Sequence, residues 1–302
     1  MLRTSSRTGI GIVYAILGIL LFSAKAVLVK VAYTYKVDHL ALLLFRMVFA
    51  LPFYLFITFY KKPLHFKEIN YKDYLWVVFF GFIGYYLASL FDFMGLRYIK
   101  AGLERIILFI YPTMVVLISW SILRKSISRI QVMAIIVTYL GVVATFWNEG
   151  PMKDGSVALG GVLIFLSALA YASYLVGSGW LIPKFGVMQF TSYAMVVSTI
   201  CIVVHYLMVK GFALPTYPKE VYYLGMAMAI FSTLIPSFLV SAAIKRLGAP
   251  TFSIFGSLGP VSTIVLAFFF LDEHISILQI IGMLIVIAGV TLVSRQKYQR
   301  YG

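Results

Sequence analysis

The stretch LDEHISILQIIGMLIVIAGV, residues 271–290, repeats LRKSISRIQVMAIIVTYLGV, residues 123–142, at a fixed offset of 148. The correspondence runs without a gap, because residues 74–146 align with residues 222–294 at the same offset. A repeat of about half the chain in so apolar a sequence is typical of a duplicated membrane protein. In many transporters such halves enclose a substrate site between them.

The composition predicts an all-α polytopic membrane protein. The chain has 302 residues, of which 62% are hydrophobic and only 12% charged, with a mean hydropathy of +0.98. Soluble domains carry about 25% charged residues. A spanning helix needs roughly 20 apolar residues, and we find ten runs near that length. They cover residues 10–32, 39–60, 74–94, 102–123, 129–147, 157–181, 187–209, 221–243, 250–271 and 276–294.

The formal charge of +15 is distributed as in a membrane protein rather than a nucleic-acid binder. With the N-terminus in the cytoplasm, inside segments carry fifteen Lys and Arg and outside loops six. This bias predicts cytoplasmic termini. We expect the protein to be integral to the bacterial inner membrane. Basic loops also suit anionic lipid, so lipid is an expected partner and nucleic acid is not.

Five spans per half is an odd number, so the second half should be inverted relative to the first. We therefore expect two inverted five-helix repeats, residues 1–150 and 151–302, the second ending in a short basic cytoplasmic tail. Turn-forming residues at 148–156 mark the boundary.

The hairpins that follow the fourth and ninth runs carry the same device. Ser128-x-x-Gln131 and Ser276-x-x-Gln279 are capping boxes, in which serine and glutamine satisfy amides at a helix start. The second hairpin lies in a longer pattern, made of Gly259-Pro260, LDEHIS at 271–276, Gln279, Gly282 and Ala288-Gly289-Val290.

This pattern resembles the EamA domain of the drug/metabolite transporter superfamily. The first half departs from it, because Arg124-Lys125 stand where the second half has Asp272-Glu273. The resemblance implies ten helices in two inverted repeats, cytoplasmic termini, and export or exchange of small metabolites such as amino acids. It does not name the substrate.

Ionisable residues inside apolar runs are costly, and those that persist usually have a partner or a purpose. Five lie toward the outer side of the first half, namely Lys25, Arg46, Asp92, Glu104 and Arg105. At the 148 offset the last three become Val240, Phe252 and Ser253, so the second half does not repeat the cluster.

Two interpretations stay open for these charges. Lys25 and Arg46 could attract a substrate carboxylate or phosphate, while Asp92 or Glu104 couples transport to protons. Alternatively, the acidic and basic groups only pair with one another, with Arg105 among them.

Polar and aromatic side chains recur at helical spacing and indicate a central cavity or polar contacts between helices. These side chains and the cations Lys25 and Arg46 form the predicted substrate-binding set. Its members are Lys25, Arg46, Tyr14, Tyr85, Ser89, Tyr111, Tyr171, Tyr174, Ser178 and Ser257. Pro112 and Pro260 interrupt matched runs and are predicted to act as hinges or gates, or else as static kinks.

These observations favour a secondary-active transporter that exports or exchanges a small polar metabolite, such as an amino acid or organic anion, by alternating access. We expect a monomer or weak homodimer. A flippase-like carrier of a lipid-linked or amphipathic substrate and a non-transporting sensor are the alternatives. Enzyme activity, a cofactor and a metal site are not expected, because metal-ligand spacing, a nucleophile with a base and a glycine-rich phosphate loop are missing from the sequence.

Overall fold

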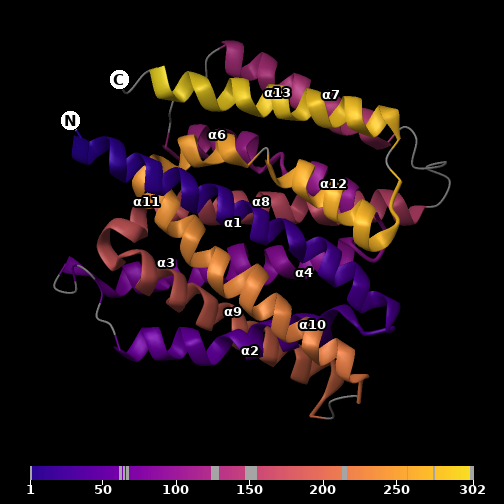
Figure 1. Cartoon of the computed structure of the whole chain (residues 1–302). Coiled ribbons are helices and arrows are strands. Elements are labelled where there is room, and N and C mark those ends of the chain that lie inside the picture. Colours follow the sequence, from indigo (N-terminus) through magenta and orange to yellow (C-terminus); the bar gives the residue numbers. More distant parts are fainter. Residues whose placement is uncertain are drawn as a thin grey trace.

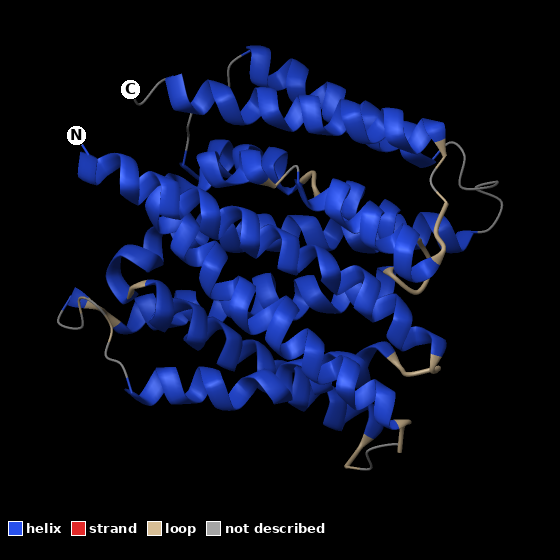
Figure 2. Ribbon diagram, viewed as in Figure 1, coloured by secondary structure: helices blue, strands red, loops and turns tan. Residues whose placement is uncertain are grey.

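The computed structural model describes residues 2–60, 63, 65, 68–123, 129–146, 155–212, 216–256, 258–274 and 276–299. Regular structure in these residues is helical throughout (Figure 2). The elements are α1 Leu2–Thr34, α2 His39–Tyr60, α3 Tyr71–Gly81, η2 Phe82–Leu87, α4 Ala88–Gly95, α5 Ala101–Leu108, α6 Tyr111–Leu123, α7 Arg129–Phe146, α8 Gly155–Phe185, α9 Val187–Lys210, α10 Lys219–Ala229, η3 Ile230–Leu234, α11 Ile235–Phe255, α12 Leu258–Leu271 and α13 Ile277–Gln299.

The molecule is an integral membrane protein by the length and composition of its helices. Within the described ranges, seven helical segments are long and apolar enough to cross a bilayer, and three shorter helices are also apolar. Helices suit this setting because they satisfy their own backbone hydrogen bonds in lipid. The number of crossings and the inverted arrangement stay predictions.

Apolar side chains cover the outside and polar ones lie within. Phe56, Met208 and Phe269 are each more than 60% exposed, whereas Asp92 and Glu104 are almost fully buried. In water such an outer surface would be an aggregation hazard, whereas lipid tails solvate it.

The helices of the two halves interleave in layers. In Figure 1, α7 and α13 pair along one face, and both chain termini lie at the same end of the molecule. The long helix α1 packs against α11 and α12, α2 packs against α9 and α10, and α8 packs against η2, α4 and α6. Residues far apart in the sequence therefore meet in the centre.

Two π-helical segments interrupt otherwise α-helical stretches at equivalent positions. The segment η2 begins at Phe82 and η3 begins at Ile230, which are separated by the same 148 residues as the sequence repeat. Such segments often mark functional sites, because they locally widen the helix and disturb its hydrogen bonding.

The helical path is also broken near Pro112 and Pro260. A turn at residues 109–110 separates α5 from α6, and Gly256 follows the last residue of α11. Each proline lies in the first turn of the next helix, where an amide would have no partner within that helix. The predicted boundary between residues 243 and 250 is wrong, because α11 continues through it to Phe255. The charges of Lys245 and Arg246 suggest a loop there, but lysine and arginine are good helix formers and do not end a helix.

Candidate functional site

A cavity of about 110 Å³ lies at the centre of the described structure. It is smaller than the pockets of drug-sized ligands, which measure about 300–1,000 Å³, so only a small molecule fits it. Its polar and charged lining consists of Ser23, Lys25, Arg46, Ser89, Arg105, Ser167, Ser232 and Thr233. Its aromatic lining consists of Phe22, Tyr85, Phe109, Tyr111, Tyr171 and Phe252.

Both π-helical segments contribute to this lining. Gly84 and Tyr85 of η2 border the cavity, as do Ser232 and Thr233 of η3. These pairs are related by the offset of 148, so equivalent positions of the two halves face the same space. Helix η2 approaches α8 closely at Gly84, where an added Cβ would overlap the side chain of Tyr174.

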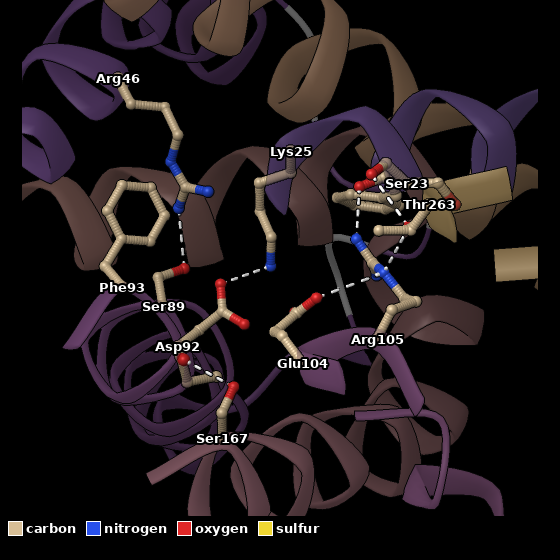
Figure 3. A network of polar contacts seen from close by, with 12 residues as sticks. Ser23, Lys25, Arg46, Ser89, Asp92, Phe93, Glu104, Arg105, Ser167 and Thr263 are labelled. Atoms are coloured by element: carbon tan, nitrogen blue, oxygen red, sulfur yellow. Dashed lines mark hydrogen bonds and ion pairs between the residues drawn. The ribbon is translucent and has the colours of Figure 1, made fainter. Parts of the chain in front are cut away.

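Lys25 and Asp92 form a short ion pair beside the cavity. The Lys25 Nζ lies 2.7 Å from Asp92 Oδ2, which joins α1 to α4 (Figure 3). The Lys25 side chain is 12% exposed and that of Asp92 only 1%, so the ammonium borders the cavity and the carboxylate stands behind it.

Arg105 is held by groups from three helices. Its Nε donates to Thr263 Oγ1 at 3.1 Å, and its Nη2 donates to the Phe22 carbonyl at 2.8 Å. The Nε also lies 3.6 Å from Glu104 Oε2. Arg105 therefore ties α5 to α1 and α12, while neither carboxylate oxygen of Glu104 has a hydrogen-bond partner within the described residues.

Arg46 is placed differently from the other two cations. It is 4% exposed, its Nη2 donates to Ser89 Oγ at 2.7 Å, and its guanidinium carbon lies 4.9 Å above the ring of Phe93 (Figure 3). Its Nε has no hydrogen-bond partner in the part of the chain that the structure describes. No carboxylate there lies within ion-pair distance of this guanidinium, which borders the cavity.

The structure brings most of the sequence-predicted site residues together. Those that line the cavity are Lys25, Arg46, Tyr85, Ser89, Arg105, Tyr111 and Tyr171. Asp92 and Glu104 lie directly behind this lining, and Ser257 is outside the described residues.

Three predicted substrate-binding residues are not in the lining. Tyr14 lies under the guanidinium of Arg246, with 4.9 Å between the guanidinium carbon and the ring centroid. Tyr174 packs edge-on against Tyr85, with ring centroids 4.7 Å apart. The Ser178 hydroxyl donates to the carbonyl of Leu175 at 2.8 Å, within its own helix.

Sequence reasoning did not select Phe22, Ser23, Ser232 or Thr233, all of which line the cavity. The offset of 148 does point to the last two, since it maps Gly84 to Ser232 and Tyr85 to Thr233. Phe22 and Ser23 lie in the apolar run of α1 and have no distinguishing pattern there.

The hairpin before α13 has the predicted capping box. The Ser276 amide donates to Gln279 Oε1 at 2.9 Å, and the Gln279 amide donates to Ser276 Oγ at 3.2 Å. The matching box at Ser128 and Gln131 falls where the structure does not describe the side chains.

Comparison with known proteins shows which family this chain resembles. Residues 9–147 and 158–295 each match the EamA-like transporter family. The uncharacterized transporter YcbK of Bacillus subtilis (strain 168) is 30% identical over 281 residues, covering 90% of this chain and 88% of that protein. YyaM of the same organism, also called an uncharacterized transporter, is 27% identical and covers 71% of each chain.

A more distant relative agrees with this placement, and a solved structure shares the fold. An uncharacterized transporter of Archaeoglobus fulgidus is 23% identical over 94% of this chain and 96% of its own length. A solved structure described only as "Crystal structure of protein" aligns over 99% of both chains with a TM-score of 0.66 and 15% identity, which shows a shared fold. The chain therefore belongs to the EamA-like transporter family, as the hairpin residues of its second half indicated.

Proposed function

We propose that this protein is a secondary-active transporter that exports or exchanges a small polar metabolite by alternating access around the central cavity. One observation carries the proposal beyond family membership: equivalent positions of the two π-helical segments line the same cavity. When two halves of similar structure exchange roles across a membrane, a site on their shared axis stays in place while access switches sides.

The proposed architecture has ten spans in two inverted repeats, residues 1–150 and 151–302. Two separate matches to the family support the division. Both termini lie at one end of the molecule, which an even number of crossings requires (Figure 1). The excess of Lys and Arg in one set of loops supports cytoplasmic termini in a bacterial cell membrane.

We propose Glu104 as the group that couples transport to protons, with Asp92 as its partner. Asp92 forms a short ion pair with Lys25 at 2.7 Å, whereas the ion pair of Glu104 among the described residues is the longer contact of its Oε2 with Arg105 Nε, at 3.6 Å. The two carboxyl groups also interact with each other. The charge of Glu104 is the less compensated of the two, so a proton exchanged there changes the local balance most.

The test is uptake of labelled amino acids, organic acids, nucleosides and sugars into proteoliposomes preloaded with the same compound. Saturable counterflow of at least one compound, absent from protein-free vesicles, supports transport. Loss of the pH response in Glu104→Gln supports proton coupling, and an unchanged response to an imposed pH difference contradicts it. Movement of labelled phospholipid between leaflets with no solute flux would instead favour a flippase.

A further inference from the structure

Positive and negative side chains lie at different distances from the cavity. The three cations Lys25, Arg46 and Arg105 all border the space, whereas Asp92 and Glu104 do not. The cavity therefore presents positive charge to whatever enters it. A cationic substrate would meet like charges in a site of low dielectric, where repulsion is strong.

Each of two cations already has a carboxylate neighbour. Lys25 is paired with Asp92 at 2.7 Å. Arg105 Nε lies 3.6 Å from Glu104 Oε2, and two further hydrogen bonds tie this guanidinium to Thr263 and to the Phe22 carbonyl. Arg46 has a serine hydroxyl and the face of a phenyl ring, and its Nε is unpartnered among the described residues.

A buried guanidinium without an ion-pair partner is costly, and a bound anion reduces that cost. Guanidinium groups also bind carboxylates through two parallel hydrogen bonds. Ser89 holds one terminal nitrogen of Arg46 in place, so the group is already oriented before an anion arrives.

Beside its cations and its serine and threonine hydroxyls, the cavity has a large aromatic surface. Phe22, Tyr85, Phe109, Tyr111 and Tyr171 contribute ring surfaces to a space of about 110 Å³. Rings favour stacked and edge-on contact with another planar group. The cavity thus combines an anchor for one negative charge with a surface for a compact apolar body.

We infer that the substrate of this site is a small organic monoanion whose carboxylate binds Arg46 and whose apolar, preferably aromatic, body packs against the rings. The inference rests on the proposed transport function and narrows it. It disfavours a zwitterion such as an amino acid, because the described lining offers the ammonium no free carboxylate.

Three probes with one ring and different charge test this directly. They are 3-phenylpropionate, phenylalanine and 2-phenylethylamine, which carry a carboxylate, both charges and an ammonium, respectively. Binding to the purified full chain is measured by calorimetry and by the ligand-induced rise in unfolding temperature. We expect 3-phenylpropionate to bind at least tenfold more tightly than the other two. Equal or tighter binding of phenylalanine, binding of inorganic phosphate alone, or binding of none of them would overturn the inference.

Variants locate the anchor. Arg46→Gln should weaken 3-phenylpropionate binding about ten- to hundredfold, as expected for the loss of a charged hydrogen-bonding group. Arg46→Lys should retain part of the affinity, and Ser89→Ala, which only frees the guanidinium, should cost less. Arg97→Gln removes one positive charge at an exposed position outside the cavity and serves as the matched control. If Arg46→Gln does not fold, the other two variants decide. Unchanged affinity in both Arg46→Lys and Ser89→Ala would contradict the assignment of Arg46 as the carboxylate anchor.

Counterflow separates this inference from the proposed function. Vesicles preloaded with 3-phenylpropionate should accumulate the labelled compound. Tight, Arg46-dependent binding without counterflow would refute transport and retain the anion site. Counterflow of phenylalanine but not of 3-phenylpropionate would refute the anion site and retain transport.

Discussion

Glu273 caps the helix that begins at Ala101, although 172 residues separate the two in the sequence. Its carboxylate accepts the amide of Ala101 at 3.0 Å and that of Gly102 at 3.2 Å. The contact joins the two segments that match the family separately. Asp272 turns the chain into position with a φ of 51°, a conformation that aspartate tolerates better than most residues. The equivalent first-half residue is Lys125, whose side chain has no acceptor for such a cap.

Removing this cap should destabilise the protein. Glu273→Ala leaves two amides at the start of α5 without their acceptor, at a cost of about 1–2 kcal/mol. Glu273→Gln keeps one acceptor oxygen and should cost less. Thermal unfolding in detergent measures both, and Glu68→Ala, which removes an exposed loop carboxylate, is the control. Equal unfolding temperatures for all three variants would show that the cap does not contribute.

The positions of the buried charges could be predicted from the sequence, but their pairing could not. Lys25, Asp92 and Glu104 stand out because each is an exception within an apolar run. Which of them touch depends on how α1, α4 and α5 pack, and no local pattern in the sequence reveals the register between those helices. The sequence therefore leaves open whether Arg46 or Lys25 pairs with a carboxylate. In the structure, Asp92 pairs with Lys25.

The π-helical segments lay beyond sequence reasoning for a different reason. In a helix surrounded by lipid and protein, apolar residues occur on every face. The extra residue in a π-helical turn therefore leaves the pattern of apolar and polar residues unchanged. The runs around Phe82 and Ile230 read as ordinary spans. Only the recurrence of polar residues at the same offset, such as Tyr85 and Thr233, hinted that both segments face the centre.

The Lys25–Asp92 pair should show strong coupling in a double-mutant cycle. Lys25→Gln strands a carboxylate that is 1% exposed, which should cost about 3–5 kcal/mol. Asp92→Asn should cost less, because the Lys25 ammonium is 12% exposed and borders the cavity. The double variant should recover most of the loss.

The matched control for this cycle is an exposed pair. Lys210 Nζ and Asp38 Oδ2 are 3.9 Å apart, with side chains 43% and 25% exposed. Lys210→Gln should change stability by less than about 1 kcal/mol. If the effects in the double variant simply add, the ion pair seen in the structure does not stabilise the fold.

Gly84 should tolerate no side chain where it packs on α8. The Cβ of Gly84→Ala would overlap Tyr174, so the π-helical segment or the tyrosine must shift, at a cost of about 1–3 kcal/mol. The shift would also narrow the cavity and weaken ligand binding. Gly179→Ala is the control, since its Cβ would meet nothing within 4 Å and alanine favours the helix by up to about 1 kcal/mol. Equal stability and ligand affinity in the two variants would argue against close packing at η2.

Pro112 and Pro260 should affect the rate of transport more than the binding of ligand. Each lies at the start of a helix that follows a break, and neither borders the cavity. Alanine at either site lets a further backbone hydrogen bond form across the break, worth about 1 kcal/mol. If the breaks move during the cycle, this extra bond must be opened each time, and turnover should fall about fivefold. The measurements are counterflow rates and ligand affinity for Pro112→Ala and Pro260→Ala, with Pro218→Ala at the exposed start of α10 as the control. Rates equal to that control in both variants would mean that the breaks are static bends that only shape the cavity.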